Sequence, residues 1–197
     1  MNIDLLSMSA HKFYGPKGVG ALYVKEGIEF EKIQNGGHQE KNKRAGTENV
    51  PGIVGLGKAI ELADSNIEEY NKKLIGLREY FIEKVQERIP YTKINGHKEK
   101  RLPGNVNLSF EYIDASSLLL HLDEKGICAS AGSACSTGEA APSHVLVAIG
   151  LEPRFLDGTL RVTFGEENTI QDVEYLIESL IEIVEKLRNM NPEYKKL

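Results

Sequence analysis

The chain has 197 residues, 41% of them hydrophobic and 27% charged, which is typical of a soluble globular protein with one large domain or two small ones. Its formal net charge of −5 argues against nucleic acid as a partner, because duplex binding requires a basic face. The sequence has no signal-peptide pattern, no apolar run of about eighteen residues and only two cysteines, which together predict a cytoplasmic protein with reduced thiols and no membrane contact.

The first third of the chain predicts two strands, a loop and a long helix. The strands are expected at residues 3–8 and 19–24, on either side of the turn sequence YGPKG. Polar, glycine-containing residues 34–47 predict a loop, and apolar residues then recur at helical spacing from residue 51 to residue 89. Because the first strand begins abruptly, without a polar entry segment, we expect the sequence to come from a longer protein.

The remaining residues alternate strands and helices. In chain order, the pattern predicts a strand at 106–110, a helix at 114–125, a short strand at 127–129, a small-residue loop at 130–141, a short helix at 142–149, a strand at 160–164 and an amphipathic helix at 169–189. Asp114 is the expected N-cap of its helix, and Gly126 ends that helix. The alternation predicts an α/β or α+β domain from about residue 69 onward.

Ser9-Ala10-His11-Lys12 is the first candidate for chemistry. A lone lysine is usually a solvated charge, but this one lies between a strand and a glycine-rich turn. An amine at such a place can form a Schiff base if its surroundings favour the neutral form. Ser9 and His11 offer hydrogen-bond donors that suit a phosphate oxygen. The nearby glycines do not form a dinucleotide fingerprint, because a strand rather than a helix follows them.

The string SMSAHKFYGPKGVGALYV resembles the cofactor-lysine segment of the NifS/IscS-type cysteine desulfurases, which are pyridoxal-phosphate enzymes of the class-V aminotransferase family. The resemblance implies that Lys12 holds pyridoxal phosphate as a Schiff base and that Ser9, Ala10 and His11 bind the cofactor. It also implies an α/β fold from the C-terminal part of a fold-type-I enzyme. Residues 1–68 would be the remnant of the large cofactor domain, and residues 69–197 the small C-terminal α+β domain.

Residues 36–52, GGHQEKNKRAGTENVPG, are the second candidate, although a polar surface loop is the plainer interpretation. The family carries a very similar string, with a small departure at Asn35. The resemblance implies that Thr47 contacts the cofactor phosphate of a neighbouring subunit, and therefore a homodimer with shared active sites. A zinc-deaminase interpretation of His38 and Glu40 fails, because no P-C-x-x-C sequence follows.

The two cysteines have different surroundings. Cys128 follows an isoleucine in an apolar predicted strand, which favours a small buried side chain. Cys135 lies among glycine, serine, alanine and threonine, which predicts an exposed thiol on a mobile loop. The string ICASAGSACSTGEAAPSHVL resembles the active-site loop of the desulfurases, and the resemblance implies that Cys135 takes sulfur as a persulfide. A cysteine-protease dyad with His144 is disfavoured, because a mobile loop does not preorganise one.

Arg161, in the strand sequence GTLRVTFG, is the last candidate. A strand arginine is most often solvated, but its planar guanidinium also binds a carboxylate through two parallel hydrogen bonds. The family has an arginine in a matching strand. The resemblance therefore implies that Arg161 holds the carboxylate of the substrate.

Taken together, the resemblance implies a cysteine desulfurase that acts on L-cysteine and passes its persulfide sulfur to an iron–sulfur scaffold or another acceptor protein. The family is about twice as long as this chain, so we expect the C-terminal half only, with an N-terminal half missing and no competent activity alone. Without the missing aspartate that pairs with the pyridine nitrogen, the cofactor is a weaker electron sink. Two alternatives stay open: a selenocysteine lyase or another class-V enzyme, and a non-catalytic dimerisation or carrier-docking module.

Overall fold

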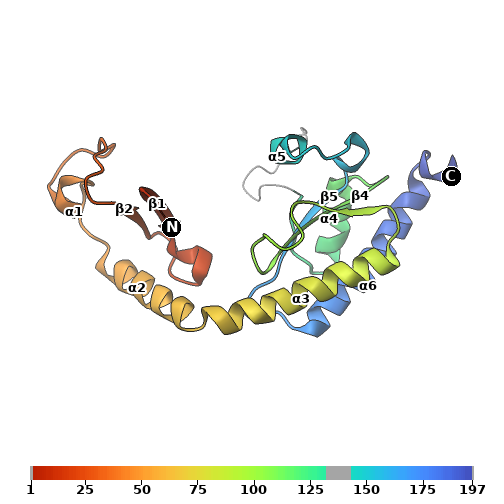
Figure 1. Ribbon diagram of the computed structural model, residues 1–197, viewed down its shortest axis with the longest axis horizontal. Helices are drawn as coiled ribbons and strands as arrows, with labels where there is room; N and C mark the ends of the chain where they lie inside the picture. The colour runs from red at the N-terminus through yellow and green to blue at the C-terminus, as the bar shows by residue number, and fades with distance from the viewer. Residues whose placement is uncertain (1, 132–142, 197) are drawn as a thin grey trace. The chain divides into compact units, whose positions relative to one another are not determined.

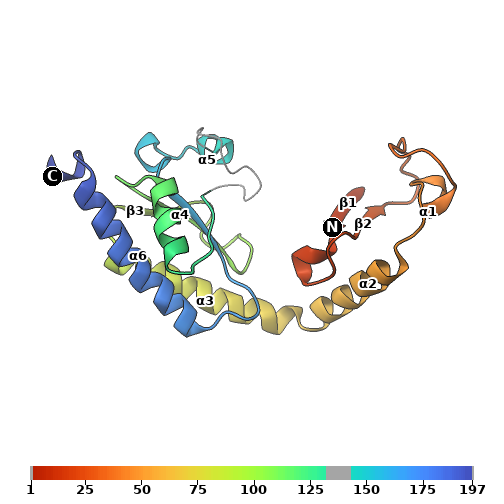
Figure 2. The ribbon, with the colours of Figure 1, turned by 180° about the vertical axis from the view of Figure 1, so that it is seen from behind.

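The computed structural model describes residues 2–131 and 143–196, and the chain divides into two compact units, Met1–Ile67 and Glu68–Leu197 (Figures 1 and 2). Each unit mixes helices with an antiparallel sheet, so the chain is a mixed α/β protein, as expected. Within the described ranges, no helix is both long enough and apolar enough to span a bilayer.

The first unit opens with a two-stranded antiparallel sheet. Strand β1 (Leu5–Ser9) pairs with β2 (Gly20–Val24), and the 3₁₀ helix η1 (Ala10–Phe13) lies in their connection. Ser9 is aligned with Gly20, where an added Cβ would lie 2.5 Å from a carbonyl oxygen of β1, so only glycine fits there. Both strands therefore form close to where the sequence predicts them.

This sheet leaves apolar side chains in solvent. On β1, Leu5 and Leu6 are 48% and 44% exposed, and on β2, Leu22 and Tyr23 are 51% and 50% exposed. Successive residues of a strand point to opposite faces, so neither face of the sheet is covered in this structure. A two-stranded sheet is only marginally stable by itself in water.

A loop and a helix complete the first unit. The loop contains one turn, α1 (Gln39–Asn42), in which three residues have left-handed φ values of 50°, 54° and 64°. Helix α2 (Val50–Ser65) begins after Asn49, whose side chain caps its first turn. The expected long helix is interrupted at Asn66, because the Asn66 amide donates to a carbonyl oxygen of the preceding turn instead of continuing the helix.

The second unit contains a three-stranded antiparallel sheet of order β3-β4-β5. Its strands are β3 (Thr92–Ile94), β4 (Asn105–Phe110) and β5 (Thr159–Thr163). The sequence predicted β4 and β5 but not the three-residue β3. The strand predicted at residues 127–129 is wrong, because only Ser130 forms a bridge with the sheet.

Six helical segments complete the described part of the second unit. They are α3 (Ile67–Arg88), α4 (Ala115–Glu124), α5 (His144–Ala148), η2 (Pro153–Phe155), α6 (Ile170–Met190) and η3 (Tyr194–Lys196). The apolar sides of α3, α4 and α6 share one core with the apolar face of the sheet (Figure 2). The fully buried side chains of that core include Phe81, Val106, Leu108, Phe110, Leu118, Leu122, Leu160, Val173 and Leu180. The opposite face of the sheet carries polar residues.

Capping residues fix where the helices of this unit begin. The Asp114 carboxylate accepts the backbone N–H and the hydroxyl of Ser117, both at 2.8 Å, as the sequence predicts. Thr169 and Asp172 form a reciprocal capping box at the start of α6. The hydrogen bonds from Thr169 hold the pKa of Asp172 below its usual value.

The polar tail sequence NPEYKKL predicts a frayed chain end, but the residues up to Lys196 pack against the end of the sheet. The ring of Tyr194 lies 5.6 Å from that of Tyr112 and 6.3 Å from that of Tyr91, between ring centroids. The Arg188 guanidinium lies 5.7 Å from the centroid of Tyr194 and donates to the carbonyl oxygens of Glu111 and Tyr91. Aromatic and cation–π contacts therefore hold the chain end as far as Lys196.

We expect Asp114→Ala to lower the free energy of unfolding of the second unit by about 1 kcal/mol, because α4 loses its N-cap. Chemical denaturation followed by circular dichroism measures this change. Ser116→Ala is the matched control, since Ser116 is exposed in the same first turn. Equal losses in the two variants would contradict a capping role for Asp114.

Candidate active site

The cofactor-lysine candidates lie in a tight turn between β1 and β2. Ala10 is fully buried, and its backbone N–H donates to the Val19 carbonyl oxygen at 3.1 Å. The turn closes through Tyr14, which has a left-handed φ of 65°, and through the Gly15 N–H, which donates to the Ala10 carbonyl oxygen at 2.9 Å. A Cβ at Gly15 would lie 2.9 Å from that of Ala10, so the turn requires glycine at this position.

This turn directs its polar side chains outward. His11 and Lys12 are exposed on η1, and Ser9 is exposed at the end of β1. Ser9 stands at the N-cap position of η1, but its side chain makes no capping hydrogen bond. Its hydroxyl is therefore available to a ligand. The structure thus brings together three of the predicted side chains on one short segment.

These residues fit a phosphate-bearing aldehyde cofactor. The uncapped Ser9 hydroxyl and the exposed His11 imidazole are donors of the kind that bind phosphate oxygens. The Lys12 amine stands next to them and is the group that forms a Schiff base with an aldehyde. The chemistry of Ser9, His11 and Lys12 therefore suits the cofactor expected from the sequence, and buried Ala10 sets the shape of the turn.

Thr47 lies exposed in the loop before α2. The Gln39 side chain accepts the Gly46 N–H at 3.2 Å, and the Ala45 N–H donates to the Gln34 carbonyl oxygen at 3.4 Å. Ala45 is only 3% exposed. The loop is thus anchored by the residues just before Thr47, and Thr47 itself is exposed to solvent.

Arg161 belongs to the second unit, where it lies on the polar face of the sheet. It pairs in register with Asn107 on β4, and its backbone N–H and carbonyl oxygen both bond the backbone of Ser130. The backbone N–H of Asn95 donates to the Asn107 carbonyl oxygen at 2.8 Å. We call these four residues, Asn95, Asn107, Arg161 and Ser130, the polar row.

The polar row continues into a buried hydrogen-bond network. The Asn95 Nδ2 donates to Asn107 Oδ1 at 2.7 Å and to Ser109 Oγ at 2.8 Å, and Ser109 Oγ lies 3.0 Å from Thr159 Oγ1. Asn95 Oδ1 is the single buried side-chain polar atom of the described residues without a hydrogen-bond partner.

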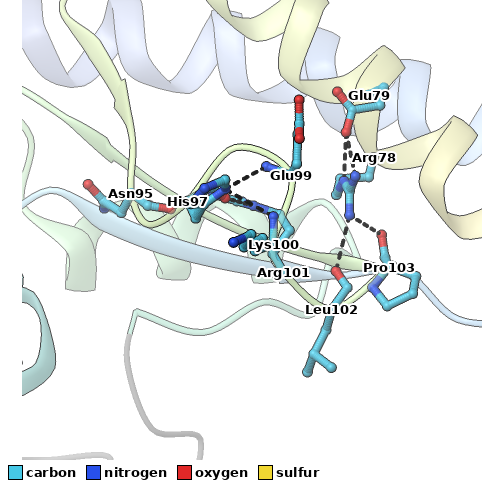
Figure 3. A network of polar contacts seen from close by, with 9 residues as sticks. All are labelled: Arg78, Glu79, Asn95, His97, Glu99, Lys100, Arg101, Leu102 and Pro103. Carbon is cyan, nitrogen blue, oxygen red and sulfur yellow. Dashed lines mark hydrogen bonds and ion pairs between the residues drawn. The ribbon is translucent and has the colours of Figure 1, made fainter.

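The loop between β3 and β4 contacts the backbone of Asn95, as Figure 3 shows. The Arg101 guanidinium donates to the carbonyl oxygens of Asn95 and His97 at 2.6 and 2.8 Å. His97 Nδ1 accepts two backbone N–H groups of the loop, and Arg78 of α3 donates to two of its later carbonyl oxygens. Burial, with a further contribution from the Arg78 charge, lowers the pKa of Arg101.

The structure describes one of the two cysteines. Cys135 lies outside the described residues, as does the small-residue segment around it. Cys128 is a free, exposed cysteine, so the expectation of a buried strand residue is wrong. The physical reason is that residues 127–129 do not pair with the sheet, so no second layer covers the thiol.

Sequence reasoning missed the amides of the polar row. The sequence NVNLSF alternates polar and apolar residues along β4, and such alternation predicts one polar face for a half-buried strand. That pattern places Asn107 on the same face as the Arg161 side chain only once the register of β4 and β5 is known. Pairing register is a tertiary property that the alternation does not specify.

Comparison with known proteins gives a consistent result. The family model for aminotransferase class-V matches residues 1–176. The chain is 53% identical to "Cysteine desulfurase IscS" of Methanosarcina thermophila and 54% identical to "Cysteine desulfurase IscS" of Clostridium botulinum, covering 100% and 98% of this chain. It spans about half the length of these curated relatives, 50% and 49%.

Solved structures agree with this comparison. A NifS-like protein from Rickettsia africae superposes with a TM-score of 0.83 at 32% identity, over 93% of this chain and 48% of that chain. The similarity extends across nearly all of both units, so the parts of the chain that carry Lys12 and Arg161 have the same fold as that structure.

Proposed function

Because the chain belongs to the aminotransferase class-V family, whose members use pyridoxal phosphate, we propose that it is the part of a cysteine desulfurase that carries Lys12, Cys135 and Arg161. The observation that carries the proposal is the 53% identity to a cysteine desulfurase over the whole chain. The reaction converts L-cysteine to L-alanine and leaves a persulfide on Cys135.

The lysine turn supplies cofactor binding and proton transfer. When bound, pyridoxal phosphate withdraws electrons from the amino acid, which acidifies the α-proton and weakens the bond to sulfur. The Lys12 amine removes the proton from the substrate α-carbon and later returns a proton, acting first as a base and then as an acid. Ser9 and His11 bind the phosphate through their free donors, which keeps the Lys12 amine next to the reacting carbon.

Cys135 accepts the sulfur, and the transfer needs no further oxidant or reductant. The Cys135 thiolate attacks the sulfur of L-cysteine, so an S–S bond forms and the C–S bond of the substrate breaks. The electron pair of that bond stays with the amino-acid carbon, which takes a proton and becomes the methyl group of L-alanine. Arg161 holds the substrate carboxylate through two hydrogen bonds while this occurs.

The pairing of Arg161 with Ser130 supports the assignment of Cys135. Ser130 is bonded to the backbone of Arg161 and precedes Cys135 by five residues in the sequence. A chain of that length spans at most about 17 Å when fully extended. The length of the connection therefore allows the Cys135 thiol to reach a substrate held by Arg161.

The finer assignments follow from the resemblance of the Thr47 and Cys135 segments to those of the family. We propose a homodimer in which Thr47 contacts the cofactor phosphate bound by the neighbouring subunit. The persulfide on Cys135 passes to an iron–sulfur scaffold or another sulfur-acceptor protein. A reducing cytoplasm suits this chemistry, because the reaction begins from a free thiolate.

The exposed apolar side chains of the sheet in the first unit indicate that the active protein contains a further polypeptide. Leu5, Leu6, Leu22 and Tyr23 are each about half exposed on β1 and β2. The relative is about twice as long as this chain, and strands from its additional residues would cover these side chains and the open strand edges. We therefore expect the purified chain to release no measurable alanine by itself, and robust turnover by the chain alone would contradict this part of the proposal.

Cys135→Ala tests the proposal directly. In the chain combined with the remaining half of a relative, pyridoxal phosphate and L-cysteine, we expect the unchanged protein to gain one sulfur atom by mass spectrometry. The Cys135→Ala variant is expected to gain none, because it has no thiolate to attack. Cys128→Ala is the matched control, since Cys128 is the other cysteine and is exposed. A persulfide that persists in Cys135→Ala and disappears in Cys128→Ala would reverse the assignment.

A further inference from the structure

The amide of Asn107 stands beside the Arg161 guanidinium on the polar face of the sheet. The two residues are register partners in the antiparallel pair of β4 and β5. Directly opposed residues of such a pair have their Cβ atoms about 4.5–5.5 Å apart and on the same face. The two side chains therefore leave the sheet together.

Asn95 determines which way the Asn107 amide points. Asn107 Oδ1 accepts from Asn95 Nδ2 at 2.7 Å, on the β3 side of the row. The amide oxygen and nitrogen lie on different sides of the planar group, so Asn107 Nδ2 faces away from Asn95. The reverse orientation would place two N–H donors against each other. Asn95 Nδ2 also donates to Ser109 Oγ, the Arg101 guanidinium donates to the backbone carbonyl oxygen of Asn95, and Asn95 is only 6% exposed.

The Asn107 amide and the Arg161 guanidinium both carry N–H donors. Within residues 2–131 and 143–196, no acceptor is hydrogen-bonded or ion-paired to Asn107 Nδ2 or to the Arg161 guanidinium. Asn107 and Arg161 are half-buried, whereas Asn95 and Ser109 on the far side of the network are buried. The network is thus closed at its β3 end and accessible where the arginine stands.

We propose that Asn107 is a second donor to the substrate carboxylate, next to Arg161, with its amide oriented by Asn95. The inference rests on the proposed function, in which Arg161 binds that carboxylate. A carboxylate has about four acceptor positions, more than the two that one guanidinium occupies. A neutral amide donor adds a charge-assisted hydrogen bond and places no second charge beside the arginine.

Carboxylate-dependent binding tests this role without cofactor or turnover. The full chain is titrated with L-alanine, the proposed product, and with L-alaninamide, which lacks the carboxylate, by isothermal calorimetry or NMR. Asn107→Asp keeps the acceptor for Asn95 but removes the donor, and Asn107→Leu removes the donor without adding charge. We expect each to raise the Kd for L-alanine by about tenfold and to leave that for L-alaninamide unchanged.

Asn105→Asp is the matched control for added charge. Asn105 lies two residues away on the same strand and face, pairs with Thr163, and is half-buried like Asn107. Its substitution is expected to change the Kd for L-alanine much less than Asn107→Asp does. Thermal unfolding of all variants reports whether the fold is retained.

The outcomes separate this inference from the proposed function. Arg161→Gln reports on the proposed arginine clamp alone. If Arg161→Gln weakens L-alanine binding but Asn107→Leu does not, the role of Asn107 is overturned and the clamp stands. An effect of Asn107→Asp without one of Asn107→Leu reflects charge repulsion and also overturns it. If the unchanged chain binds L-alanine no better than L-alaninamide, both the clamp and the second donor are overturned.

Discussion

Replacing Phe81 by alanine is expected to lower the free energy of unfolding of the second unit by about 3–5 kcal/mol. Phe81 is fully buried on α3 and meets the Phe164 ring edge-on, with 5.7 Å between ring centroids. Its removal leaves a cavity between α3 and the sheet, which the surrounding residues fill only in part. Chemical denaturation followed by circular dichroism is the suitable measurement, because the chain contains no tryptophan.

Ile75→Ala provides the comparison on the same helix. Ile75 is 40% exposed, so its substitution removes a similar apolar group from α3 without opening a cavity. We expect its loss of stability to be well under half that of Phe81→Ala. Losses of similar size at the two positions would show that α3 does not pack against the sheet as the structure has it.

Lys12→Ala is expected to abolish covalent retention of pyridoxal phosphate and to lower alanine release by about 10²–10⁴-fold, because the amine acts as both Schiff-base partner and proton carrier. The measurement is the visible absorbance of the bound cofactor after gel filtration, together with turnover of L-cysteine. The protein used is the chain combined with the remaining half of a relative.

Lys17→Ala is the matched control for Lys12→Ala. Both lysines are exposed on the connection between β1 and β2 and lie five residues apart. Stability is expected to change by less than about 0.5 kcal/mol in either variant, because neither side chain is buried. Cofactor retained equally in both variants would remove Lys12 from the site.

Local pattern predicted most of the elements. The period of apolar residues in α6 predicted its buried side, including Val173, Leu176 and Leu180, because a helix that covers a sheet must place its apolar residues on one stripe. Asp114 and Gly126 marked the ends of α4 through chemistry that acts within a few residues. These features depend on neighbours in the sequence, and the sequence contains them.

Features that depend on distant residues were predicted poorly. Strand β3 has three residues, too few for a period, and forms because β4 supplies its partners. Residues 127–129 have strand-forming composition, but only Ser130 meets β5. The tail was expected to fray because its own sequence has no apolar pattern, yet the Tyr194 ring packs against the rings of Tyr91 and Tyr112.

The residues of the candidate site also differ in whether neighbouring residues in the sequence were enough to predict them. Ser9, His11 and Lys12 are adjacent in the sequence, so a resemblance over one short string identifies them together. Asn107 and Asn95 acquire meaning only from the pairing register that sets them beside Arg161. The roles of Lys12, Thr47, Cys135 and Arg161 in catalysis and binding stay predictions.

The contacts at the two ends of α6 make this helix inseparable from the sheet it covers. A capping box secures its first turn, and Arg188 with Tyr194 ties its last turn to the ends of β3 and β4. A helix held in this way does not open progressively from its free end, as terminal helices usually do. We therefore expect helix and sheet to lose their structure in one cooperative step, so that the surface carrying Arg161 stays ordered up to global unfolding of the second unit.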